Sequence, residues 1–277
     1  YISAGIALGA GRPREALELY STLDPHCPWA AEWVGPWNDW TAAFHLLDEH
    51  RRELKEARRA RQWHPDRLEA LFIELRALAA LGRLDAVRED LARTAEMASE
   101  RGWTPGTVMR RTAAELRVHG HAAAADQALE AALAWYEARP AEDRSRPAYR
   151  MAYYDALFMS GRLRQAEQLA AGFHPDRPGS PDLLGREGVL AARMGASGRA
   201  REIAALLEAV RGPYQRGSVD YWLAAIAAWS GEPEHALTLL RRALDQGRPR
   251  GIALHADPFV EPLWPVPAFQ VAVAEDR

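Results

Sequence analysis

Apolar residues recur at steps of three and four along most of the chain, which is the spacing of one face of an α-helix. One such stretch has apolar side chains at Leu84, Val87, Leu91, Ala95 and Ala98. Similar stretches run over residues 68–81, 107–118, 148–159, 183–194 and 221–229. No stretch has the Val-, Ile- and Thr-rich alternation that is typical of a β-strand. The pattern therefore predicts an all-α protein.

A short turn motif separates these helical stretches. Its starts fall at residues 11, 48, 82, 120, 161, 198 and 231, a spacing of 33 to 41 residues. Most copies begin with glycine and place alanine five residues later, as in Gly11 to Ala16 and Gly161 to Ala166, whereas Asp48 replaces the glycine in the second copy. Glycine suits a turn that ends a helix, because the position after a helix often needs positive φ. The repeat predicts about seven stacked helical hairpins.

These repeats resemble the tetratricopeptide repeat family, whose unit has about 34 residues with a glycine-containing turn and an alanine five residues later. Trp37, Tyr153 and Tyr221 with Trp222 are the nearest equivalents of the bulky aromatic positions of that family. The resemblance covers nearly the whole chain and implies a right-handed helical-hairpin solenoid over residues 1–247.

Residues 248–277 are expected to form a separate capping segment. Prolines at 258, 262, 265 and 267 rule out a long helix there, so a folded-back cap is the physical interpretation. The stretch from His255 to Phe269 also resembles the tails that follow such arrays in bacterial signalling proteins.

The amino-acid composition argues against several classes of function. The chain has 35 basic and 38 acidic residues and a formal net charge of −3, which does not favour nucleic-acid binding. Cys27 is the only cysteine, which excludes an internal disulfide framework and any multi-thiolate metal site. Lys55 is the only lysine and lies in a charged run, not behind a glycine-rich turn, which argues against lysine-based cofactor chemistry. No stretch reaches about 18 consecutive apolar residues, the length that would span a membrane. Tyr1 begins inside an apolar pattern, so we expect a fragment or a processed product, and a cytoplasmic location is favoured.

No catalytic motif occurs, so no catalytic residue, cofactor or metal ligand is expected. His45 and Glu49 are four residues apart and would suit a metal pair, but a charged, solvated turn is the favoured interpretation. His119 and His121 are two residues apart, which is poor spacing for one helical face.

Two side-chain clusters have alternative interpretations. The basic run Arg51–Arg61 is interrupted by Glu53 and Glu56, which favours a solvated helix face over an anion or nucleic-acid patch. Four tryptophans lie between the first two hairpins, where they either fill a widened gap or form a binding surface. They are Trp29, Trp33, Trp37 and Trp40.

The resemblance also implies a groove. In the family, the first helices line a concave face through positions 13, 10, 6, 3 and 2 before the turn residue. Counted in this way, the partner-binding residues are Asn38, His45, Phe72, Arg76, Arg110, Arg117, Met151, Asp155, Phe158 and Tyr221. The same count places Gly185, Gly188 and Gly195 on the groove floor. Arginines suit carboxylates, and methionine and aromatic surfaces suit apolar peptide side chains.

The expected function is a non-catalytic scaffold that binds a partner peptide or subunit in this groove, where an acidic segment would suit the arginines. One alternative is a regulatory C-terminal region of a larger bacterial signalling protein, such as a kinase or transcription regulator. A second is an accessory subunit of a larger complex. A third is an enzyme inside the superhelix that uses His45 with Asp155 or Glu49 for acid–base chemistry. A nucleic-acid binder would use the Arg51–Arg61 helix.

Overall fold

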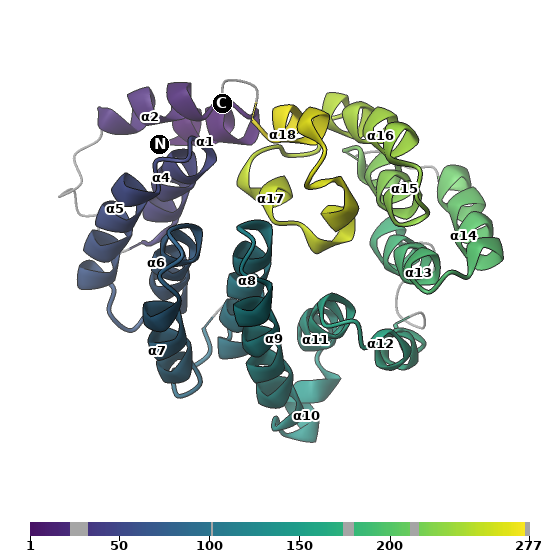
Figure 1. Ribbon diagram of the computed structural model, residues 1–277, viewed down its shortest axis with the longest axis horizontal. Helices are drawn as coiled ribbons and strands as arrows, with labels where there is room; N and C mark the ends of the chain where they lie inside the picture. Colours follow the sequence, from purple (N-terminus) through teal and green to yellow (C-terminus); the bar gives the residue numbers. More distant parts are fainter. Residues whose placement is uncertain (23–32, 101, 174–179, 211–215, 275–277) are drawn as a thin grey trace. The chain divides into compact units, whose positions relative to one another are not determined.

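The computed structural model describes residues 1–22, 33–100, 102–173, 180–210 and 216–274. Within these ranges the chain forms α-helices and one 3-10 helix, and the β-type pairing is limited to an isolated bridge between Glu100 and Trp103. The all-α prediction is confirmed (Figure 1). None of the described helices is both long enough and apolar enough to cross a lipid bilayer.

Consecutive helices pack pairwise as hairpins. The pairs are α1 (Ile2–Gly9) with α2 (Pro13–Ser21), α4 (Gly35–Leu46) with α5 (His50–Trp63), α6 (Leu68–Ala80) with α7 (Leu84–Thr94), α8 (Pro105–Val118) with α9 (Ala122–Glu137), α11 (Pro147–Met159) with α12 (Leu163–Ala170), α13 (Pro181–Arg193) with α14 (Ser197–Ala209), and α15 (Ser218–Trp229) with α16 (Pro233–Asp245). A short helix, α10 (Ala141–Ser145), follows α9, and the chain ends with α17 (Ile252–His255), the 3-10 helix η1 (Pro258–Leu263) and α18 (Pro267–Val273).

Local sequence explains where these helices begin and turn. Proline occupies the first turn of several helices, including α8 and α13, where its missing N–H removes no helical hydrogen bond. Thr104 caps α8 by accepting a hydrogen bond from the Thr107 N–H at 3.1 Å. In the second turn, Asp48 adopts φ = 57°, so a short polar side chain takes the left-handed position that glycine fills in the other turns.

The sixth turn differs from the sequence-based register. The residue with positive φ there is Gly195, at 76°, whereas Gly198 lies inside α14. Gly195 also precedes the buried Ala200 by five residues, which matches the other turns. The alignment on Gly198 was therefore wrong by three residues. That alignment matched the Gly-Arg pair, whereas the spacing from glycine to alanine identifies Gly195. Gly195 therefore belongs to the turn and not to a groove floor.

This difference predicts opposite effects for two similar substitutions. Gly195→Ala should lower the free energy of unfolding by about 1–2 kcal/mol, because an alanine is strained at positive φ. Gly198→Ala should raise it by about 0.5–1 kcal/mol, because the position is helical and an added Cβ would meet no neighbouring atom within 4 Å. Chemical denaturation of both variants measures the difference. The reverse order of stabilities would restore the turn at residue 198.

The chain divides into two compact units. Unit 1 comprises residues 1–144, 251–256 and 273–277, and unit 2 comprises residues 145–250 and 257–272. The core of unit 1 includes Leu71, Ile73 and Leu75 of α6, all of which are buried. The core of unit 2 is aromatic, and Phe158 and Phe259 pack with ring centroids 5.1 Å apart. The C-terminal segment therefore supplies residues to both units, and a boundary at residue 247 stays a prediction.

Candidate functional site

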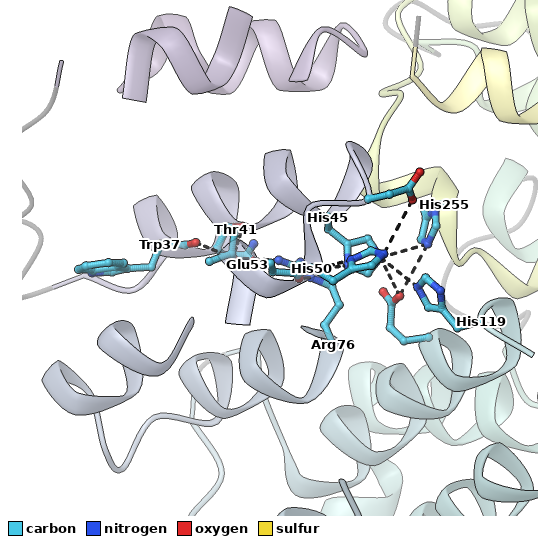
Figure 2. A network of polar contacts seen from close by, with 11 residues as sticks. Trp37, Thr41, His45, His50, Glu53, Arg76, His119 and His255 are labelled. Carbon is cyan, nitrogen blue, oxygen red and sulfur yellow. Dashed lines mark hydrogen bonds and ion pairs between the residues drawn. The ribbon is translucent and has the colours of Figure 1, made fainter. Parts of the chain in front are cut away.

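A cluster of histidine and glutamate side chains lies inside unit 1. His45 comes from α4, Glu115 from α8, His119 from the residue that caps the C-terminus of α8, and His255 from α17. His45 is fully buried, Glu115 and His255 are 3% and 4% exposed, and His119 is half-buried. Figure 2 shows the rings of the three histidines pointing toward one another.

The polar atoms of this cluster converge on one small volume. His45 Nε2 lies 3.2 Å from His255 Nε2, 3.4 Å from His119 Nε2 and 3.4 Å from Glu115 Oε2. Glu115 Oε2 lies 3.8 Å from His255 Nε2. All four ligand-type atoms are within 4.8 Å of one another. Four groups that can each donate an electron pair therefore face a common centre.

A second layer of polar groups fixes the orientation of His45 (Figure 2). Its Nδ1 donates a hydrogen bond to Glu53 Oε2 at 2.8 Å, because a carboxylate can only accept. Arg76 Nε donates to Glu53 Oε1 at 2.7 Å, and Arg76 also donates to the Thr41 hydroxyl at 2.8 Å. Thr41 donates in turn to the Trp37 carbonyl at 2.7 Å. When the His45 ring is neutral, its hydrogen bond to Glu53 keeps the proton on Nδ1. The lone pair is then on Nε2, which faces the cluster.

The electrostatic environment favours positive charge at the centre of the cluster. Burial disfavours the charged form of His45, but the attraction of Glu53 and Glu115 raises its pKa to about 9. Burial would raise the pKa of Glu115, yet the interaction with His45 lowers that pKa to about 2. For His119, burial and the neighbouring His45 lower the pKa to about 4, so this imidazole is neutral at neutral pH.

The sequence did not indicate this cluster. His45 pairs with Glu53, eight residues away, whereas Glu49, the expected partner, pairs with Arg52 at 2.5 Å. His45 and His255 are 210 residues apart, so no motif spacing could connect them. The one local signal is the four-residue spacing of Glu115 and His119 at the end of α8, which places two candidate ligands on one helical face. His119 and not His121 faces the cluster.

Six of the ten predicted groove residues are buried. They are His45, Phe72, Arg76, Asp155, Phe158 and Tyr221. In unit 1, Arg76 pairs with Glu53, and Arg117 pairs with Asp126 at 3.0 Å. Phe72 packs against Trp103 with ring centroids 5.3 Å apart. Partner binding by the less buried members, Asn38, Arg110, Arg117 and Met151, stays a prediction.

The C-terminal segment explains much of this burial. In unit 1, His255 of α17 covers His45. In unit 2, the Phe259 ring packs on Phe158, and the Tyr221 hydroxyl donates to Asp257 Oδ2 at 2.5 Å. Asp155 is paired separately, with Arg186 Nε at 3.2 Å. Several positions that were expected to face a partner are therefore covered by the chain's own end, and they cannot offer an open binding surface in this conformation.

The described tryptophans of the first connection mostly fill space between α2 and α4. Trp37 is buried and stacks on Trp40, and Trp40 also stacks on Tyr20 of α2. Trp33 is 49% exposed and packs edge-on against Tyr1. Trp29 lies outside the described residues. The gap-filling interpretation therefore holds for Trp37 and Trp40.

The basic run on α5 is partly neutralised by acidic neighbours. Arg58 and Arg61 pair with Glu74 at 3.0 and 2.9 Å, and Arg59 pairs with Glu56 at 2.8 Å. Such half-exposed pairs match the expected solvated face.

An apolar groove lies elsewhere in unit 1, between α7 and α9, with Met109 of α8 at its base. Its volume is about 470 Å³. Val87, Leu91 and Trp135 are buried in its walls. Its rim is formed largely by small side chains, namely Ala92, Ala95, Ala131, Ala134 and Ala138. This groove was not predicted from the sequence, because the positions counted from each turn lie on the first helices of the hairpins.

Comparisons with known proteins give a structural similarity but no match by sequence. No protein-family profile and no curated protein matches the chain. The structure is similar to the crystal structure of a tetratricopeptide repeat protein from Parabacteroides merdae, with 12% sequence identity and a TM-score of 0.47. The match covers 94% of this chain and 95% of that one.

Proposed function

We propose that this protein is a non-catalytic scaffold that binds an amphipathic helix of a partner protein in the groove between α7 and α9. The observation that carries the proposal is the groove itself, an apolar groove of about 470 Å³ lined mainly by the second helices of two consecutive hairpins. Protein grooves of this kind accept the apolar face of a helix through residues spaced by three and four positions.

The dimensions of the groove support a helical occupant. Helix α7 has 11 residues, so its wall extends for about 16 Å, or three helical turns. The alanines of the rim allow the backbone of an incoming helix to approach closely, and Leu91 and Trp135 supply larger apolar surfaces below it. Buried aromatic and aliphatic side chains at the centre of an interface carry most of its binding energy.

Charge supports an acidic flank on that helix. The charged residues that line the groove are Arg88 and Arg139, and both are positive. Arg88 is exposed and pairs with Asp85 at 2.9 Å, whereas Arg139 stacks over Trp135 at 4.6 Å from the ring centroid. Rim charges of this type set the partner preference and the association rate more than the affinity.

Two biological roles are compatible with such a scaffold. In one, the protein is the regulatory region of a larger bacterial signalling protein. In the other, it is an accessory subunit of a larger assembly. Both require a stable interaction with a partner protein. The catalytic alternative has less support, because Asp155 is paired with Arg186 and Glu49 with Arg52.

Partner capture with paired variants tests the proposal. Ala131→Glu, which places a charge in the apolar groove, should weaken binding of the captured partner by at least about 10-fold, as expected for the centre of an interface. Ala123→Glu is the matched control, since Ala123 is exposed on the same helix but does not line the groove. Dissociation constants measured by calorimetry give the comparison. Equal affinities for both variants would place the interface elsewhere.

A further inference from the structure

We infer that His45, Glu115, His119 and His255 form a binding site for a divalent transition-metal ion of the zinc class. The inference is independent of the proposed function, because the cluster and the groove share no residues. It rests on the geometry of four buried or half-buried groups and on the hydrogen bonds that orient one of them.

The spacing of the four atoms fits tetrahedral coordination. Zinc binds histidine nitrogens and carboxylate oxygens at about 2.0–2.1 Å in four-coordinate sites. The edge of a tetrahedron with such bonds is about 3.3 Å. The three contacts of His45 Nε2 with His255, His119 and Glu115 measure 3.2, 3.4 and 3.4 Å. Glu115 Oε2 and His255 Nε2 are farther apart, at 3.8 Å, and all four atoms lie within 4.8 Å of one another. One ion would therefore reach all four ligands once side-chain movements shorten the longer edges.

A proton accounts less well for the same arrangement. A single N–H on His45 Nε2 can be donated along only one direction, yet two imidazole nitrogens and one carboxylate oxygen surround that nitrogen. Charge-assisted hydrogen bonds are also shorter, at about 2.7–2.9 Å. Glu115 Oε2 is buried, and its nearest polar partners among the described residues are His45 Nε2 at 3.4 Å and His255 Nε2 at 3.8 Å, both longer than a regular charge-assisted hydrogen bond. A cation at the centre would interact with all of these atoms at once.

The surrounding groups are those that support a metal-bound histidine. Ligating histidines usually donate their second N–H to a carboxylate, and His45 Nδ1 donates to Glu53 at 2.8 Å. Arg76 holds that carboxylate at 2.7 Å.

The alternative set of His45, His50 and Glu53 is less suitable. Both carboxylate oxygens of Glu53 are already engaged, one by Arg76 and the other by the two histidines. His50 and Glu53 therefore belong to the supporting layer of the site.

The site assigns a structural role to the ion. Four protein ligands fill a tetrahedral shell and leave no position for a substrate, as in closed structural zinc sites. The ligands join α4 and α8 to α17, so the ion would fasten residues 251–256 to the hairpins of unit 1. The half-buried His119 is the ligand nearest to solvent and gives the ion a route of entry.

Zinc titration of the full chain tests this inference. The protein is purified with a histidine-free tag, treated with a chelator and titrated with Zn²⁺ by calorimetry, and its metal content is measured by mass spectrometry. We expect one zinc ion per chain and a zinc-dependent rise in melting temperature. Cobalt should give the intense visible absorption of a four-coordinate complex.

Ligand variants locate the ion. His119→Ala and His255→Ala should each weaken zinc binding by more than about 100-fold, beyond the 10- to 100-fold typical of second-layer changes. His235→Ala is the control, because this exposed histidine pairs only with Glu232 among the described contacts, and its affinity should equal that of the unmodified protein. His119→Ala alters a half-buried cap position, so it keeps the test decisive if His255→Ala fails to fold. Absence of zinc binding, or unchanged affinity in His119→Ala, would overturn the inference.

Discussion

Arg76→Met is expected to lower the free energy of unfolding by about 3–5 kcal/mol, the cost typical of removing one partner of a buried ion pair. Arg76 is 1% exposed and holds the fully buried Glu53 at 2.7 Å. Methionine preserves much of the side-chain volume but supplies no donor. Glu53 would then retain only its contacts with His45 and His50. Denaturant titration of the chain without added metal measures the change.

The control for this prediction is Arg58→Met. Arg58 pairs with Glu74 at 3.0 Å, but its side chain is 52% exposed, so its loss should cost about 0–1 kcal/mol. Similar small effects for Arg76→Met and Arg58→Met would mean that Arg76 faces solvent, as a groove residue would. A large effect at Arg76 alone would confirm that its ion pair with Glu53 is buried.

Phe158→Ala is expected to cost about 3–5 kcal/mol, the range for truncating a buried phenylalanine. Phe158 has no exposed surface and packs against Trp229 and Phe259, with ring centroids 5.6 and 5.1 Å away. The Arg193 guanidinium lies 4.6 Å from the centroid of its ring. Alanine would leave a cavity among these large groups, which cannot collapse easily. Thermal and denaturant unfolding both measure the loss.

Leu206→Ala provides the comparison within unit 2. Leu206 is 47% exposed on α14, and surface substitutions of this kind usually change stability by less than about 0.5 kcal/mol. If Phe158→Ala were as mild as Leu206→Ala, the C-terminal segment would not cover Phe158 in solution. The predicted groove position would then be open to a partner.

The helical architecture could be predicted because it depends on local signals. The spacing of apolar residues predicts the helices. The turns need a residue that tolerates positive φ, and the repeat alignment identified Asp48 as the residue that replaces glycine in the second turn. The sixth turn shows the limit of this reasoning. Gly195 and Gly198 both follow a helical stretch, and only the distance to the buried Ala200 separates them.

The histidine cluster could not be predicted in the same way. Its members come from α4, α8 and α17, and what joins them is the return of residues 251–256 to unit 1. Counting inward positions from each turn selected His45 and Arg76, which are buried in the structure, but the count assumed an open face. The same segment that was expected to cap the last repeat supplies His255, which covers His45. The burial of both side chains is therefore a tertiary property that repeat periodicity does not encode.

The α7–α9 groove could not be predicted from the sequence either, for a different reason. Family-based counting directs attention to the first helices, whereas the groove is lined mainly by the second helices. Alanines at 124, 128, 131 and 138 indicate only a small-residue face on α9. Whether such a face packs against a neighbour or remains open depends on the separation of α7 and α9.

Site-specific photo-crosslinking tests the central claim most directly. A photoreactive amino acid is placed at position 131 in the groove or at position 123 on the same helix outside it, and the captured partner is analysed by mass spectrometry. The account predicts crosslinks from position 131 to the apolar face of one partner helix and none from position 123. Crosslinks from position 123 with none from position 131 would contradict it.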